Sequence, residues 1–210
     1  MRRARQHSES RVRERRQRVA HEAARLMAAG TIDDYHQAKL KAASRLGIHD
    51  EASLPRNREI EEALRQHQRL FESQAHPTLL QARREVAMQA LEFFAPFHPR
   101  LAGAVLEGTA VSNSPVQLHL HSDDAEAVML FLVEHRIPAD AGARRLRLDR
   151  SRSTDAPTWR FEADGIGIEL TVLPRDTLRQ APLSPLDDKP MWRASAAQLR
   201  QLMEREEPDH

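Results

Sequence analysis

Two histidines and one glutamate are the residues whose types and spacing first suggest chemistry. His119 and His121 belong to the alternating segment Val116-Gln-Leu-His-Leu-His121, and a strand places residues two apart on one face. Two imidazoles on one face, with Glu169 as a third ligand from another segment, would suit Zn²⁺. The alternative is a pair of solvated strand histidines, since the chain contains eleven histidines and chance pairs are expected.

Carboxylates offer a second chemistry, because Mg²⁺ takes oxygen ligands and neutralises charge on phosphates during transfer. Asp123, Asp124 and Glu169 form the acid set for such a reaction. The two aspartates stand directly before an apolar-periodic segment, where capping of a helix N-terminus also explains them. Glu169 alone is a poor Mg²⁺ site, so we predict no resident cofactor and keep Mg²⁺ and Zn²⁺ as alternatives.

Arginines form the third group. Eight of them crowd the first eighteen residues, a cluster that the net charge of +1 conceals. Guanidinium groups that neutralise phosphates release counterions, so the cluster predicts nucleic-acid binding; the alternative is a solvated tail that leads into a helix. Arg144, Arg145 and Arg147 could clamp phosphates or protect an edge strand. The candidate nucleic-acid contacts are Arg11, Arg15, Arg16, Arg18, Arg145 and Arg147.

Helical periodicity runs through the residues before Pro96 and predicts four helices. Gly30 and Gly47 supply C-terminal stops, and Thr31 is expected to cap the second helix. Ala43-Ser-Arg-Leu-Gly47 also has the spacing of a helix-turn-helix, which opens the alternative of DNA binding by this region. The expected helices cover residues 11–29, 31–46, about 57–71 and 77–95.

The apolar period then changes from about 3.6 residues to 2, which indicates strands. Asp164-Gly165 between two alternating runs predicts a tight hairpin, because a type I′ turn needs positive φ at both positions. We expect a helix at 123–135 and a capped helix after Ser195. The expected strands are 101–106, 116–121, 145–148, 158–163 and 166–173.

Alternation also assigns the two faces of the sheet. We expect Gln117, His119 and Glu169 on a polar, more open face. The opposite, buried face should carry Val116, Leu118, Leu120, Ile168, Leu170 and Val172.

The order of elements over about residues 78–174 resembles the core of the nucleotidyltransferase-fold superfamily. In that family a Gly-Ser/Thr turn precedes a strand with two metal-binding carboxylates spaced i, i+2, and a later strand supplies a third acid. Here Gly108-Thr109 matches the turn and Glu169 the third acid. Pro115 and Gln117 stand at the paired positions, so the resemblance implies the fold with its metal site dismantled.

That resemblance predicts an α+β protein: a helical region (1–76), a nucleotidyltransferase-like mixed sheet with helices on one face (77–174), and a C-terminal wrap with a short helix (175–210). The implied function is a catalytically degenerate, regulatory protein that binds a nucleotide or RNA and a protein partner. Glu169 remains as the catalytic-type acid, and the implied nucleotide contacts are Gly108, Thr109, Ser114, Gln117 and His119.

Two other functions stay open. One is an active metal-dependent nucleotidyltransferase that uses Asp123, Asp124 and Glu169; the other is a DNA-binding regulator that uses the N-terminal helices. Without cysteine the chain forms no disulfide and no thiolate metal site, which fits a reducing compartment. With no apolar run as long as a membrane span, we expect a cytoplasmic protein without membrane contact.

Overall fold

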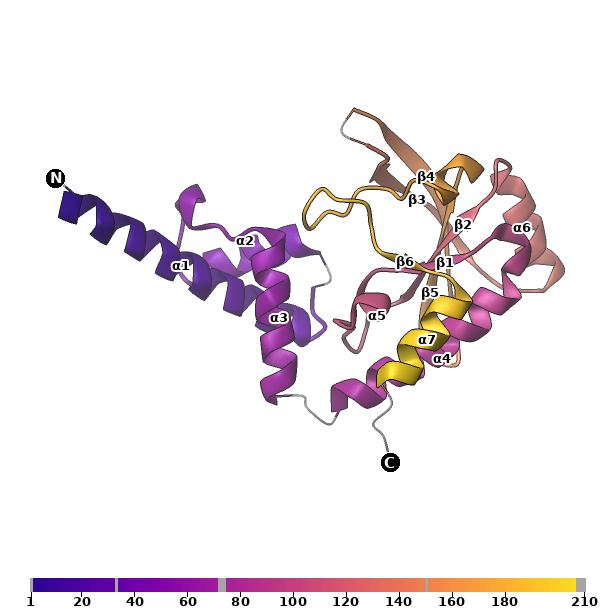
Figure 1. The fold of residues 1–210 in the computed structure, drawn as a ribbon, viewed down its shortest axis with the longest axis horizontal. Coiled ribbons are helices and arrows are strands. Elements are labelled where there is room, and N and C mark those ends of the chain that lie inside the picture. The colour runs from indigo at the N-terminus through magenta and orange to yellow at the C-terminus, as the bar shows by residue number, and fades with distance from the viewer. Residues whose placement is uncertain (1, 33, 72–74, 150, 207–210) are drawn as a thin grey trace. The chain divides into compact units, whose positions relative to one another are not determined.

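The computed structural model describes residues 2–32, 34–71, 75–149 and 151–206, with side chains from Glu9 onward. The chain is α+β, as predicted: helices come first, and a six-stranded mixed sheet follows (Figure 1). It divides into two compact units. One comprises Met1–His76 and Pro185–Asp187, and the other comprises Pro77–Ser184 and Asp188–His210.

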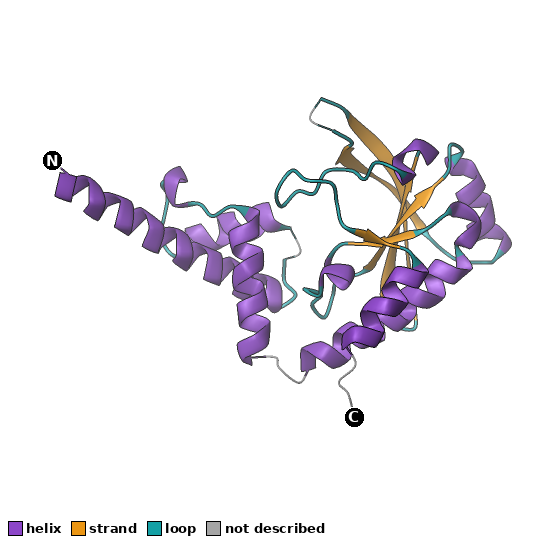
Figure 2. Cartoon of the chain, viewed as in Figure 1, coloured by secondary structure: helices purple, strands orange, loops and turns teal. Residues whose placement is uncertain are grey.

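The described part of the first unit consists of helices joined by loops and contains no strand (Figure 2). Helix α1 (Arg2–Ala28) packs against α2 (Tyr35–Arg45) and α3 (Asn57–Phe71), and a 3₁₀ turn (Glu51–Ser53) links the last two. Small side chains on α1 and α2 let the helices approach closely. The buried residues of this unit include Val19, Ala23, Leu26, Ala38, Ala42, Ile60 and Leu64.

The expected cap of α2 was wrong by three residues. Asp34 is the N-cap, and its carboxylate accepts a hydrogen bond from the Gln37 amide at 2.8 Å. The Thr31 hydroxyl instead donates to the Leu26 carbonyl at 2.9 Å. Thr31 therefore satisfies the C-terminus of α1, which leaves the next helix to start later.

The sheet lies wholly in the second unit. Its strand order is β3-β4-β5-β2-β1-β6; only β2 and β5 run parallel, and the remaining neighbours are antiparallel. The strands are β1 (Arg100–Ala102), β2 (Val116–His121), β3 (Asp140–Arg147), β4 (Ser153–Ala163), β5 (Ile166–Leu173) and β6 (Arg193–Ala194).

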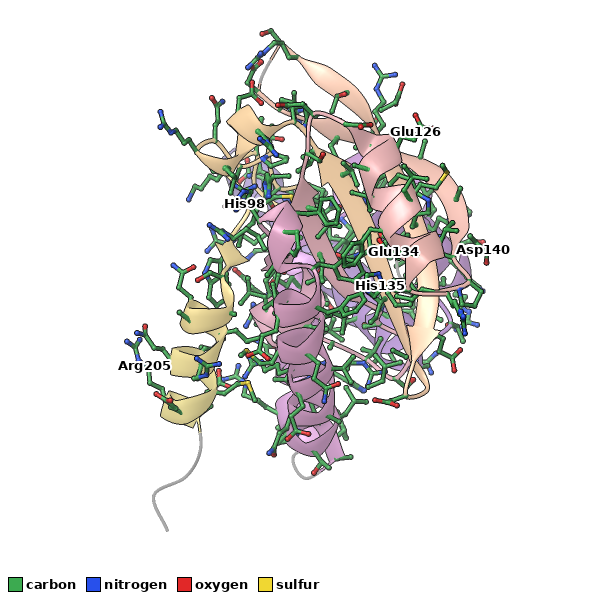
Figure 3. All side chains as sticks on the ribbon, turned by 90° about the vertical axis from the view of Figure 1, so that its right-hand side faces the viewer. His98, Glu126, Glu134, His135, Asp140 and Arg205 are labelled. Carbon is green, nitrogen blue, oxygen red and sulfur yellow. The ribbon has the colours of Figure 1, made fainter. Side chains whose placement is uncertain are left out.

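Helices cover one face of this sheet, as predicted. They are α4 (Ala75–Phe93), the short α5 (Ala104–Glu107), α6 (Ala125–Glu134) and α7 (Ala196–Glu206). Figure 3 looks onto this side and shows α4, α6 and α7 in front of the strands. The core beneath them includes Leu91, Phe94, Val128, Leu132 and Leu199, together with Val116, Leu118, Leu120, Ile168, Leu170 and Val172.

The structure confirms two local predictions by their geometry. Asp164 and Gly165 have φ of 51° and 73° and join β4 to β5. Ser195 and Gln198 form a capping box at the start of α7, with each side chain bonded to the other residue's backbone amide. Both features are local, so neighbouring residues suffice to specify them.

The first strand was predicted too long. It ends at Ala102, because Gly103 adopts φ 72° and ψ −158° and starts the short helix α5. A Cβ at Gly103 would lie 2.2 Å from Oε1 of Gln117, so a larger residue would have to displace that side chain, and the positive φ itself favours glycine. The segment expected to finish a strand is therefore a helical turn that ends at Gly108.

Among the described residues, no helix combines the length and the apolar character that crossing a bilayer requires.

Candidate functional site: the polar face of the sheet

The face opposite the helices gathers polar and charged side chains from four neighbouring strands. Glu169 of β5 is level with Gln117 of β2 on one side and with Arg160 of β4 on the other. Residues two apart share a face, so Arg144, Thr158, His119 and Thr171 also belong to this side. We call this surface the polar face.

Glu169 lies at the centre of the polar face and is held by two guanidinium groups. Arg144 donates to Oε1 at 2.7 Å, and Arg160 donates to Oε2 through Nε at 2.7 Å, with its Nη2 at 2.6 Å. Gln117 adds a long contact, 3.5 Å from its Nε2 to Oε1. Both carboxylate oxygens are thus occupied by charge-assisted hydrogen bonds, which are stronger than neutral ones.

The prediction that this face is more open was wrong at its centre, although the polarity of the two faces was right. The Glu169 side chain is 4% exposed, whereas Arg160 is 71% exposed and Arg144 41% exposed. His119 and Thr171 are buried as well. Arginine side chains can lie over a carboxylate with their aliphatic stems and keep their charged ends in water, so the face is polar and still closed.

His121 is fixed in one neutral form by its two neighbours. Its Nε2 lies 3.0 Å from Nη1 of Arg193, which can only donate, so Nε2 accepts. The proton therefore resides on Nδ1, which lies 2.8 Å from the His98 carbonyl. Burial, with nearby Arg193 and Arg100, lowers the pKa of His121 to about 4.

His119 is buried, and its Nδ1 has no hydrogen-bond partner among the described residues. Burial lowers the pKa of His119 to about 3, and the positive charges of Arg193 and Arg144 act in the same direction. His119 is therefore neutral near pH 7. A buried nitrogen without a partner costs free energy, which a hydrogen bond from a bound molecule would recover.

The polar face carries excess positive charge. Arg193 is half-buried and donates to the carbonyls of Thr177 and Leu178, and burial lowers its pKa. Arg100 is level with His119 in the sheet. Arg144 and Arg160 contact the buried carboxylate of Glu169, and Arg100 and Arg193 add two guanidinium groups farther along the same face, on β1 and β6. Such an arrangement attracts anions, and phosphate above all, because guanidinium matches its geometry.

The predicted phosphate-binding loop uses its amides and its hydroxyl in hydrogen bonds to its own backbone. The amides of Gly108 and Thr109 both donate to the Ala104 carbonyl, and the Ser114 hydroxyl accepts from the Val111 amide. Arg83 of α4 holds the same loop by donating to the carbonyls of Ser112 and Ser114. The turn that approaches the polar face is Gly103, not Gly108.

Two of the three candidate zinc ligands are already engaged: His121 with His98 and Arg193, and Glu169 with its two arginines. In the described part of the chain no cluster of three or more His, Asp or Glu side chains is arranged to hold a metal. The residues therefore do not fit a zinc ion.

The candidate magnesium acids do not meet either. Asp124 caps α6 by accepting from the Glu126 amide, and Asp123 accepts from the Arg175 amide. Both follow β2, whereas Glu169 is level with Gln117, four residues before β2 ends. That separation along the strand is at least about 13 Å. The three acids cannot share one ion.

The predicted nucleic-acid contacts fall into different surroundings. On α1, Arg15 forms an ion pair with Asp50 at 3.3 Å, and Arg16 donates to the Ala52 carbonyl at 2.6 Å, so both help to hold the 3₁₀ turn. Arg11 and Arg18 are exposed. On β3, residues 145 and 147 point away from the polar face by alternation; Arg147 pairs with Asp188 at 2.5 Å, and Arg145 is exposed.

Reasoning from the sequence missed Arg100, Arg160 and Arg193. One signal could have found Arg160: a two-residue turn at 164–165 fixes the hairpin register and sets residue 160 opposite residue 169. Arg100 and Arg193 are brought in by long-range pairing of β1 with β2 and β6, for which the sequence has no local signal.

Comparisons with protein-family models, with curated proteins and with solved structures found no match for this chain.

Proposed function

We propose that the chain is a nucleotidyltransferase-like protein without catalysis, and that its polar face binds a phosphate-bearing ligand, a nucleotide or RNA, without a divalent metal. The single observation that carries this proposal is the pair of arginines on Glu169. In the family that the chain resembles, the acid at this position binds a metal. Here guanidinium groups stand where the metal's positive charge would be.

The chemistry of the face supports binding rather than transfer. Glu169 acts as an internal counter-charge that holds Arg144 and Arg160 in place, so less rotamer freedom is lost when a ligand binds. The exposed guanidinium of Arg160 keeps donors for a phosphate oxygen, because its Nη1 is not used on Glu169. With both oxygens of Glu169 occupied, no free carboxylate remains there to coordinate Mg²⁺.

Calorimetry with the full chain tests this proposal. ATP, UTP and a short single-stranded RNA should bind equally well in Mg²⁺ and in EDTA, and the affinity should fall with salt as phosphate contacts predict. Arg160→Ala should weaken binding. Arg145→Ala is the matched control, because it removes the same charge from the neighbouring strand on the opposite face.

The same protein should release no pyrophosphate from nucleoside triphosphates with Mg²⁺ or Mn²⁺. Turnover abolished by Glu169→Ala would restore the enzyme interpretation. Equal loss of binding in Arg160→Ala and Arg145→Ala would show that general surface charge, rather than the polar face, binds the ligand.

A further inference from the structure

Helix α6 exposes an unusual amount of apolar surface on the helix-covered side of the second unit. Leu130 is 58% exposed and Val133 is 66% exposed, and Met129 beside them is also exposed. Val128 and Leu132 fill the core beneath the same helix. Helix α6 is apolar on every side except at its ends. A surface helix normally turns polar residues outward, so this stripe departs from that pattern.

Aromatic rings extend the apolar stripe beyond the helix. Phe93, at the end of α4, is 40% exposed and packs edge-on against Phe131 of α6, with ring centroids 5.2 Å apart. The His135 ring lies 4.9 Å from Phe93 and 4.1 Å from Phe131. We call this surface the α6 patch, formed by Phe93, Met129, Leu130, Phe131, Val133 and His135.

The α6 patch is rimmed by negative charge. Glu126 lies at the first turn of α6 and Glu134 at its last, as Figure 3 shows. Residues 123–137 hold four carboxylates and one arginine, Arg136. Both glutamates are exposed, and Asp123 and Asp124, directly before the helix, add further negative charge.

This rim argues against a second copy of the chain as the occupant. An antiparallel pair of α6 helices centred on Leu130 would set Glu126 of each copy beside Glu134 of the other, and a parallel pair would set each glutamate beside its own twin. Like charges at an interface are unfavourable in both arrangements. Helix α1 of a second copy has arginines, but its apolar residues Val19, Ala23 and Leu26 are buried.

We propose that the α6 patch is a docking site for a basic amphipathic helix of another protein. Its apolar residues, spaced i, i+3, i+4 and i+7, would cover Leu130, Val133 and Phe93, and its lysines or arginines would face Glu126 and Glu134. Helix-in-groove recognition of this kind uses apolar anchors for affinity and charges for partner choice. This site lies on the opposite side of the sheet from the polar face, so it stands independently of the proposed ligand site.

Fluorescence anisotropy with the full chain tests the docking site. The probe is a labelled helical peptide of about 18 residues, five turns long, with a leucine stripe flanked by lysines. Its matched partner has glutamate in place of every lysine. The basic peptide should bind and the acidic one should not. Leu130→Ser/Val133→Ser should weaken the basic peptide by at least about tenfold.

Two further variants test whether peptide binding depends on the α6 patch and on its glutamates. Trp192→Ser removes an exposed apolar side chain outside α6 and should leave binding unchanged. Glu126→Lys/Glu134→Lys should reverse the preference, so that the acidic peptide binds better. Equal binding of both peptides, or full binding by Leu130→Ser/Val133→Ser, would overturn the proposal. Sedimentation that shows a dimer of the full chain, dissociated by the same double substitution, would assign the patch to a second copy instead.

Discussion

On strands β2 and β5, successive residues enter two different environments that exclude water by different means. Leu118 and Leu170 belong to the apolar core beneath the helices, whereas His119 and Glu169, their chain neighbours, lie among arginines. Burial of the first pair is stabilising in itself. Burial of the second pair costs desolvation, which specific partners must offset.

The contrast between the two faces shows where function can reside in this sheet. The helix-covered face uses residues that are interchangeable within their size, since its stability depends on volume and apolar area. The polar face depends on particular partners, because a buried carboxylate needs its guanidinium groups. A ligand can compete for those groups.

The largest effect should follow removal of both arginines that hold Glu169. Arg144→Ala/Arg160→Ala removes both charged partners from a carboxylate that is 4% exposed in the folded protein, and we expect a loss of about 3–5 kcal/mol in the free energy of unfolding. Urea denaturation followed by tryptophan fluorescence measures it, since both tryptophans, Trp159 and Trp192, belong to the second unit.

Glu169→Gln supplies the control for that measurement. In the Glu169→Gln background the same two arginine substitutions should cost about 1 kcal/mol or less, because exposed guanidinium groups return to water readily. An equal cost in both backgrounds would mean that the arginines stabilise the sheet by packing, and not by pairing with the carboxylate.

Leu170→Ala probes the helix-covered face at the adjacent position. Leu170 is fully buried, and truncation should cost about 2–5 kcal/mol through lost apolar burial and the cavity left behind. Leu170→Met conserves volume and should cost less than about 1.5 kcal/mol. The same urea titration measures this loss of unfolding free energy, which should be equal in the Glu169→Gln background. Strong coupling between positions 169 and 170 would contradict the independence of the two faces.

The sequence was informative where the interactions are local. Alternation separated the two faces of β2 and β5, and the Asp164-Gly165 turn specified the hairpin that sets Arg160 opposite Glu169. It was uninformative for α6, because that helix is apolar all round and periodicity cannot select its buried side. Arg193 reaches His121 only through pairing of β6 with β1, a contact that no local pattern encodes.

Gly103, at the end of β1, is another residue whose role depends on a contact that no local sequence pattern encodes. Gly103 adopts a conformation that is almost confined to glycine, and the side chain of Gln117 fills the space of a Cβ. One reason for glycine there is the Gln117 side chain, which lies on another strand. The local sequence therefore offered no reason to single out Gly103, and the predicted turn was Gly108-Thr109 instead.

Gly103→Ala should therefore cost about 1–3 kcal/mol, from backbone strain and from the clash with Gln117. Adding Gln117→Ala removes the clash but not the strain, so the double variant should recover only part of the loss. A double-mutant cycle from urea titrations separates the two contributions. If Gly103→Ala has no effect, the polar face is packed more loosely there than the helix-covered face.

The smallest effect should come from mild acidification, from about pH 6.5 to 5.5. The pKa of His119 is lowered from its usual value near 6.5 to about 3 by burial and by nearby Arg193 and Arg144. Below pH 6.5 the unfolded chain binds a proton at this residue and the folded chain does not, so stability should fall as the pH drops from about 6.5 toward 3. Between pH 6.5 and 5.5 the loss should be about 1 kcal/mol for His119.

His121, whose pKa is lowered to about 4, adds a loss in the same direction. Urea titrations across this pH range should show His119→Gln with a shallower slope than the unmodified protein, whereas His49→Gln, which replaces an exposed histidine of the helical unit, should leave the slope unchanged. An anion bound on the polar face would partly offset the protonation cost, so saturating ATP should also reduce the slope. A slope that ATP leaves unaltered, despite measured binding, would place the bound phosphate away from His119.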